Sequence, residues 1–173
     1  RLRRSKSLWI GVAVMLLFSV GLCLSEYRSN QTQYGYETSL DAVFFSPYIL
    51  VGVLIAVFCS VFVGTEYSDG TIRNKLVVGH SRKSIYLANF VSCAAAGLLM
   101  VLGYLVAACA LGIPLLGPLK TNARTALLLF FDGILLTVAS AAIFCLLSML
   151  NSNKAFAAII SIVVAFAAIF LFA

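Results

Sequence analysis

Apolar residues dominate five long stretches of the chain, and short polar segments separate them. A bilayer has a hydrocarbon core of about 30 Å, which an α-helix crosses with about 20 residues. The stretches are continuously apolar rather than alternating, which favours helices over the strands of a membrane barrel. The pattern therefore predicts an all-α polytopic membrane protein with a single transmembrane domain over residues 1–173. The expected spans are about 8–24, 42–64, 85–113, 125–150 and 155–173.

Two prolines lie at expected helix boundaries. Pro47 falls in the first turn of the second span, where a missing N–H costs little. The third span is expected to end before Pro114, because proline interrupts the backbone hydrogen bonds of a helix. The third span is also rich in small residues, including Gly97, and small residues allow helices to approach closely.

Composition excludes a soluble globular protein. Mean hydropathy is +1.07, and only 10% of residues are charged, whereas a soluble domain carries about 25%. The sequence starts at Arg1 and ends at Ala173 within an apolar stretch. We therefore expect a fragment whose last span is missing.

The basic residues predict the orientation of the chain in the membrane. Lys and Arg are concentrated on the cytoplasmic side of membrane proteins. With a cytoplasmic N-terminus, nine would lie inside and three outside, a clear bias. The net charge of +6 does not indicate nucleic-acid binding, because these residues lie at span boundaries rather than along one face. The inner set is Arg1, Arg3, Arg4, Lys6, Arg73, Lys75, Arg82, Lys83 and Lys154, and the outer set is Arg28, Lys120 and Arg124.

A polar, basic loop at residues 65–84 joins the second and third spans. Its middle predicts a short amphipathic helix, since Ile72, Leu76 and Val77 fall on one face that can pack against the spans. Ser81 is a suitable N-cap for the third span. Three further residues are favourable N-cap types for the short helix: Ser68, Asp69 and Thr71.

A set of residues around this loop follows a recognisable pattern: Phe62, Gly64, Glu66, Gly70, Thr71, Ile72, Arg73, Ser81 and Arg82. The pattern reads Phe-x-Gly-x-Glu, then Gly-Thr-Ile-Arg, then Ser-Arg, and it resembles the loop between the second and third spans of ABC-2 type transporter permeases. The chain departs from the family at Gly79-His80, where Pro is often found, and at Asn89, where Lys is frequent. The resemblance extends to residues 151–154 before the fifth span. Permeases of this family usually have six spans.

The resemblance implies a permease subunit of an ATP-driven exporter in a bacterial plasma membrane. The loop would then be a coupling helix that docks on a separate ATP-binding cassette subunit, and a second permease copy or homologue would complete the transporter. The implied coupling residues are Glu66, Gly70, Thr71, Ile72, Arg73 and Arg82. Glu66 is expected to pair with Arg73 or Arg82, or to accept backbone N–H bonds. Lys75 and Lys83 are expected to interact mainly with anionic lipid of the bilayer.

Asp132 is the one charged residue well inside an apolar stretch. It either faces a substrate or proton pathway, or it marks the beginning of the fourth span, where an acid suits a helix N-terminus. The first reading leaves a secondary transporter open as an alternative, and a non-transporting membrane scaffold is another.

The sequence offers no chemistry of its own. It contains no phosphate-binding loop, so ATP hydrolysis is expected on another chain and this subunit is not expected to be an enzyme. The five cysteines stand apart from one another and from His80, so no metal site, redox motif or cofactor is expected.

Overall fold

The computed structural model describes residues 6–32, 40–79, 81–117, 120–151 and 153–172. Within these ranges the chain is helical and contains no strand, which confirms the predicted all-α class. The helices are α1 (Lys6–Thr32), α2 (Leu40–Phe45), α3 (Pro47–Ser68), α4 (Thr71–Val77), α5 (Arg82–Leu116), α6 (Ala123–Leu150) and α7 (Lys154–Phe172). His80 lies outside the described residues.

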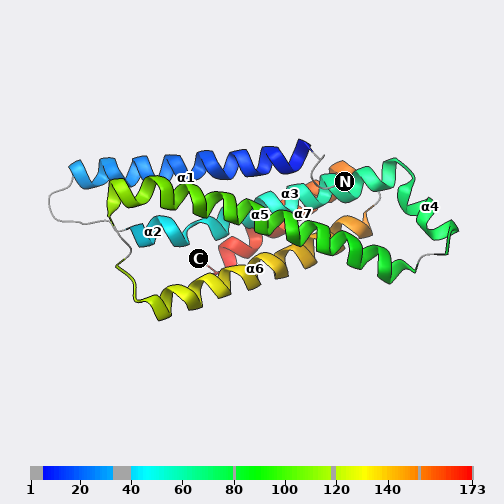
Figure 1. The fold of residues 1–173 in the computed structure, drawn as a ribbon. Coiled ribbons are helices and arrows are strands. Elements are labelled where there is room, and N and C mark those ends of the chain that lie inside the picture. Colours follow the sequence, from blue (N-terminus) through cyan, green and yellow to red (C-terminus); the bar gives the residue numbers. More distant parts are fainter. Residues whose placement is uncertain (1–5, 33–39, 80, 118–119, 152, 173) are drawn as a thin grey trace.

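The long helices form an elongated bundle in which α3 is central (Figure 1). α1 packs mainly on α5, whereas α3 packs on α6 and α7 as well as on α5. Half of the apolar window of α3 is buried, compared with a third or less for α1, α5 and α6. The short helix α4 projects from one end of the bundle.

Four of the described helices are long and apolar enough to cross a membrane: α1, α3, α5 and α6. α7 is also apolar, but its described apolar part, Ala155–Phe170, is shorter. The beginnings of α1, α5 and α7 and the end of α6 lie at the same end as α4 (Figure 1). The basic residues assigned to the inner side are therefore brought to one end of the bundle, as far as the structure describes them.

The second expected span is divided near its beginning. α2 ends at Phe45, and α3 begins at Pro47, the first residue of its helix. In a continuous helix, the carbonyl of Val43 would accept a hydrogen bond from the backbone N–H of residue 47, which proline lacks. That carbonyl instead accepts bonds from the hydroxyl of Ser46, at 2.9 Å, and from the hydroxyl of Tyr104 on α5. The carbonyl at the helix break therefore has hydrogen-bond donors inside the bundle.

Two other boundaries differ from those expected. α5 continues through Pro114 to Leu116, because a proline two residues before a helix end removes only one backbone bond near that end. α1 continues past residue 24 to Thr32, and polar residues there extend the helix, as when Gln31 donates to the Tyr27 hydroxyl at 2.9 Å.

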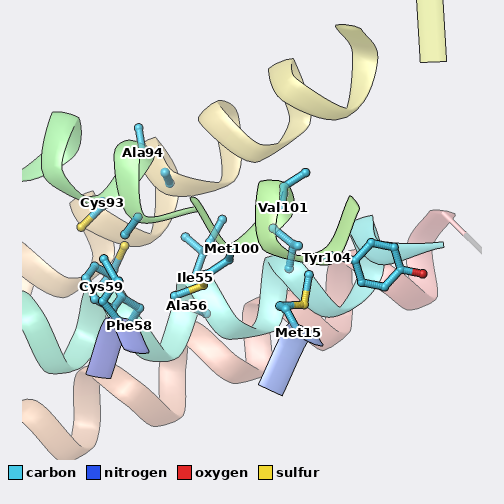
Figure 2. Close-up of a cluster of buried hydrophobic side chains, with 14 of the residues drawn as sticks. Met15, Ile55, Ala56, Phe58, Cys59, Cys93, Ala94, Met100, Val101 and Tyr104 are labelled. Atoms are coloured by element: carbon cyan, nitrogen blue, oxygen red, sulfur yellow. The ribbon is translucent and has the colours of Figure 1, made fainter. Parts of the chain in front are cut away.

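The core lies where α1, α3, α5 and α6 meet. Met15 of α1, Ile55 of α3 and Met100 of α5 are fully buried there (Figure 2). α5 lies close to both α3 and α6 at Gly97, where a Cβ atom would lie 2.7 Å from Ile55 Cδ1 and 3.1 Å from Thr137 Cγ2. The small residues of the third span therefore serve helix packing.

Candidate functional site

The end of α3 and the beginning of α4 are joined by a tight turn at Gly70. Gly70 has φ +66°, a left-handed conformation that strongly favours glycine. It is also the N-cap of α4, and its carbonyl accepts from the Asn74 N–H at 3.0 Å. The expected N-cap role of Ser68, Asp69 and Thr71 was wrong, because no side chain caps α4. The turn redirects the chain so that α4 runs across the end of the bundle toward α5 (Figure 1).

A buried carboxylate links α3, α4 and α5. Glu66 on α3 is only 7% exposed. Lys75 Nζ of α4 lies 3.1 Å from its Oε1 and 3.0 Å from its Oε2. Asn89 Nδ2 of α5 donates to Oε2 at 3.2 Å, and Asn89 is itself buried. We refer to Glu66, Lys75 and Asn89 as the carboxylate clamp.

The clamp corrects one expectation about this loop and adds to another. Glu66 forms its ion pair with Lys75, whereas Arg73 and Arg82 are exposed and form no ion pair with the described residues. Lys75 is therefore part of the loop's internal structure, a role that the expected lipid contact did not include. Asn89 could have been noticed as a partner of Glu66, because it is a single amide within an apolar stretch. No local sequence feature indicated that Lys75 would be the other partner.

α4 turns a different face to the bundle than its apolar pattern predicted. Ile72 is buried, as expected, but Leu76 is 39% and Val77 is 81% exposed. Ile72 and Lys75, one turn apart, face α3 and α5, whereas Arg73 and Val77 share an outward face. The ion pair sets this rotation, because Lys75 reaches Glu66 only if Leu76 and Val77 turn away.

Other contacts fix the ends of the helices around the clamp. The Tyr67 hydroxyl, next to Glu66, donates to the Met149 carbonyl at the end of α6 at 2.7 Å. Ser81 caps α5 as predicted, with its hydroxyl accepting from the Ser84 N–H at 3.2 Å. The first bond ties the end of α3 to the end of α6, and the second fixes the beginning of α5.

Asp132 lies in the third turn of α6, because that helix begins nine residues earlier at Ala123. The helix therefore begins before Asp132, and whether the membrane span itself begins there stays a prediction. The side chain is exposed in the single chain and makes no ion pair with the described residues. It precedes Leu150 by 18 residues, so it lies about 27 Å from the end of α6 that adjoins α4.

Three cysteines that are distant in sequence meet inside the bundle. Cys93 of α5 lies near Cys59 of α3 and Cys145 of α6, and Figure 2 shows Cys59 and Cys93 close together. All three are buried free thiols. Among the described residues, no group of three His, Cys, Asp or Glu side chains could hold a metal ion. The thiols pack as small apolar groups.

Comparison with known proteins gives one assignment. Neither the curated proteins nor the solved structures contain a match to this chain. The model of one family, described as ABC-2 family transporter protein, matches residues 1–168. That match covers the bundle, the loop and the carboxylate clamp, and it agrees with the pattern around Glu66 and Arg73. The chain is a multi-pass membrane protein that belongs to the ABC-2 family of transporter proteins.

Proposed function

We propose that the chain is the permease subunit of an ATP-driven exporter in a bacterial plasma membrane, with its N-terminus in the cytoplasm. α4 is the coupling helix and docks on a separate ATP-binding subunit, and a second permease copy or homologue completes the complex. The observation that carries this proposal is the buried Glu66 carboxylate, which joins α4 to both α3 and α5.

The clamp gives α4 a mechanical connection to the membrane part. Lys75 belongs to α4, and Asn89 lies two turns into the 35-residue helix α5. A charge-assisted bond is stronger than a neutral one, and it is strengthened further where water is scarce. A displacement of α4 by a partner would therefore move the beginning of α5 with it. The contact of buried Ile72 adds an apolar component to the same connection.

The outward face of α4 suits a protein partner. Arg73 offers a guanidinium that can bind a carboxylate through two hydrogen bonds. Val77 and Val78 are 81% and 76% exposed beside it, and exposed apolar groups rimmed by charge are typical of interaction sites. Gly70 and Thr71, which are partly buried, hold this face at the end of the turn.

Charge reversal on α4 tests the docking. We expect Arg73→Glu to abolish co-purification with the cognate ATP-binding subunit, because it replaces the guanidinium with a like charge facing the partner's acids. Arg124→Glu, an equally exposed arginine at the opposite end of the bundle, is the matched control and should co-purify normally. Unchanged co-purification of Arg73→Glu would refute the docking role.

The clamp is tested separately from docking. Glu66→Ala leaves Asn89 buried without its acceptor, at a cost of about 1–3 kcal/mol, and it frees Lys75. We expect this variant to bind the ATP-binding subunit but to lose stimulation of ATP hydrolysis. The exchange Glu66→Lys with Lys75→Glu should restore stimulation in part, because it restores an ion pair. Full stimulation in Glu66→Ala would rule out transmission through the clamp.

A further inference from the structure

A groove between α5 and α6 opens at the same end of the bundle as α4. Its volume is about 510 Å³, within the range of small-molecule sites, about 300–1,000 Å³. Arg82 and Lys83, the first two residues of α5, border it. The rest of its lining is apolar apart from one tyrosine hydroxyl: Tyr86, Leu87, Leu146, Met149 and Leu150.

The charges and the apolar lining of the groove are arranged in sequence along α5. Arg82 and Lys83 begin the helix, and Leu87 follows about one turn deeper. Both cations are exposed and form no ion pair with the described residues. Leu87 and Leu146 are also half or more exposed. The groove thus offers two unneutralised cations next to an open apolar surface.

The walls of the groove are fixed by contacts inside the chain. The Tyr86 hydroxyl donates to the Ala142 carbonyl of α6 at 3.2 Å, which joins the two helices beside the groove. Met149 is held through its carbonyl by the Tyr67 hydroxyl. The groove is therefore shaped by contacts within the chain itself.

We infer that this groove binds one anionic glycerophospholipid of the inner leaflet. The phosphate lies against Arg82 and Lys83, and an acyl chain lies along Leu87 and Leu146. An amphiphile with a negative head fits both halves of the site, since basic pockets between membrane helices on the cytoplasmic side bind anionic headgroups. A free phosphate would leave the apolar half unused. The leaflet rests on the proposed orientation, and Arg82 then serves lipid binding rather than docking of the ATP-binding subunit.

Lipid binding to the purified full chain in detergent, without any ATP-binding subunit, tests the inference. We expect native mass spectrometry to show phosphatidylglycerol retained in preference to phosphatidylcholine. Arg82→Gln and Lys83→Gln should each weaken phosphatidylglycerol retention about fivefold, the contribution of one basic residue near an anionic surface. Arg73→Gln removes a charge from the same end but outside the groove, and it should have no effect.

A second pair of variants tests the apolar half. Leu146→Trp fills the groove and should displace phosphatidylglycerol, whereas Leu135→Trp, at an exposed position of α6 outside the groove, should not. Competition by inorganic phosphate, equal retention of both lipids, or normal retention in Leu146→Trp would each overturn the inference. Loss of ATP-subunit binding in Leu146→Trp with lipid retention intact would assign the groove to the protein partner instead. Failure of the coupling proposal alone would leave the lipid selectivity unchanged.

Discussion

Several polar groups inside the bundle have a specific partner from another helix. The Val43 carbonyl, which lacks the N–H donor of residue 47 because that residue is proline, accepts from the backbone N–H and hydroxyl of Ser46 and from the hydroxyl of Tyr104. The Ser60 hydroxyl of α3 lies 3.3 Å from that of Ser148 on α6. Within a bilayer such bonds have no competition from water, although each contributes only about 1 kcal/mol. They fix which helices are neighbours more than how stable the bundle is.

Tyr104 gives a direct test of this compensation. Tyr104→Phe removes the hydrogen bond to the Val43 carbonyl, and we expect it to cost about 1 kcal/mol. Tyr86→Phe is the control. It removes a hydroxyl bond to the Ala142 carbonyl, but that carbonyl lies inside the regular helix α6 and keeps its backbone donor. Thermal unfolding of both variants in the same detergent should show the larger loss for Tyr104→Phe. Equal losses would show that the proline break needs no such compensation.

The carboxylate clamp marks the limit of what single residues reveal in a sequence. Glu66 could be predicted as a functional residue, because anchoring a basic loop to lipid does not require an acid beside it. Its partners could not, since Lys75 reaches it only after the turn at Gly70, and Asn89 reaches it from another helix. Both are three-dimensional consequences of how α4 runs across the end of the bundle. Arg73 is closer to Glu66 in the sequence than Lys75 is, but its side chain is exposed on the outward face of α4.

At the scale of elements, hydrophobicity located the helices and misplaced several of their ends. Five apolar stretches correspond to α1, α3, α5, α6 and α7. The ends depend on local backbone chemistry that hydropathy does not register. Pro47 starts a helix because Tyr104 accommodates the break before it, whereas Pro114 fails to stop one because it lies close to the end.

Close packing of α5 against α3 and α6 depends on the absence of a side chain at Gly97. Gly97→Ala places a methyl group within 2.7 Å of Ile55 Cδ1 and 3.1 Å of Thr137, and we expect it to destabilise the bundle by about 1–3 kcal/mol. Gly52→Ala on α3 meets nothing within 4 Å. It should instead stabilise by up to about 1 kcal/mol, because alanine is the better helix former. Thermal unfolding in detergent should show a lower unfolding temperature for Gly97→Ala and an unchanged or higher one for Gly52→Ala. A higher unfolding temperature for Gly97→Ala would contradict the tight packing.

For the whole molecule, the two ends of the bundle have different chemistry. One end contains α4, the clamp and the basic beginning of α5. The other end contains Arg124 and the C-terminal ends of α1 and α5. If the first end faces the cytoplasm, Asp132 lies about 27 Å away along α6. The hydrocarbon core is about 30 Å thick. That distance places the acid near the outer boundary, where an ionised group costs little.

Asp132 provides a test that distinguishes an ATP-driven exporter from a transporter driven by an ion gradient. We expect Asp132→Asn to leave ATP hydrolysis by the complex in proteoliposomes within about twofold of the wild-type rate, because a charge near the boundary contributes little. A protonophore should have no specific effect on either protein. Substrate transport that requires a proton or sodium gradient, continues without ATP and disappears in Asp132→Asn would instead identify Asp132 as a coupling site. The carboxylate clamp would then be a structural feature of the loop rather than the connection between a motor and the membrane.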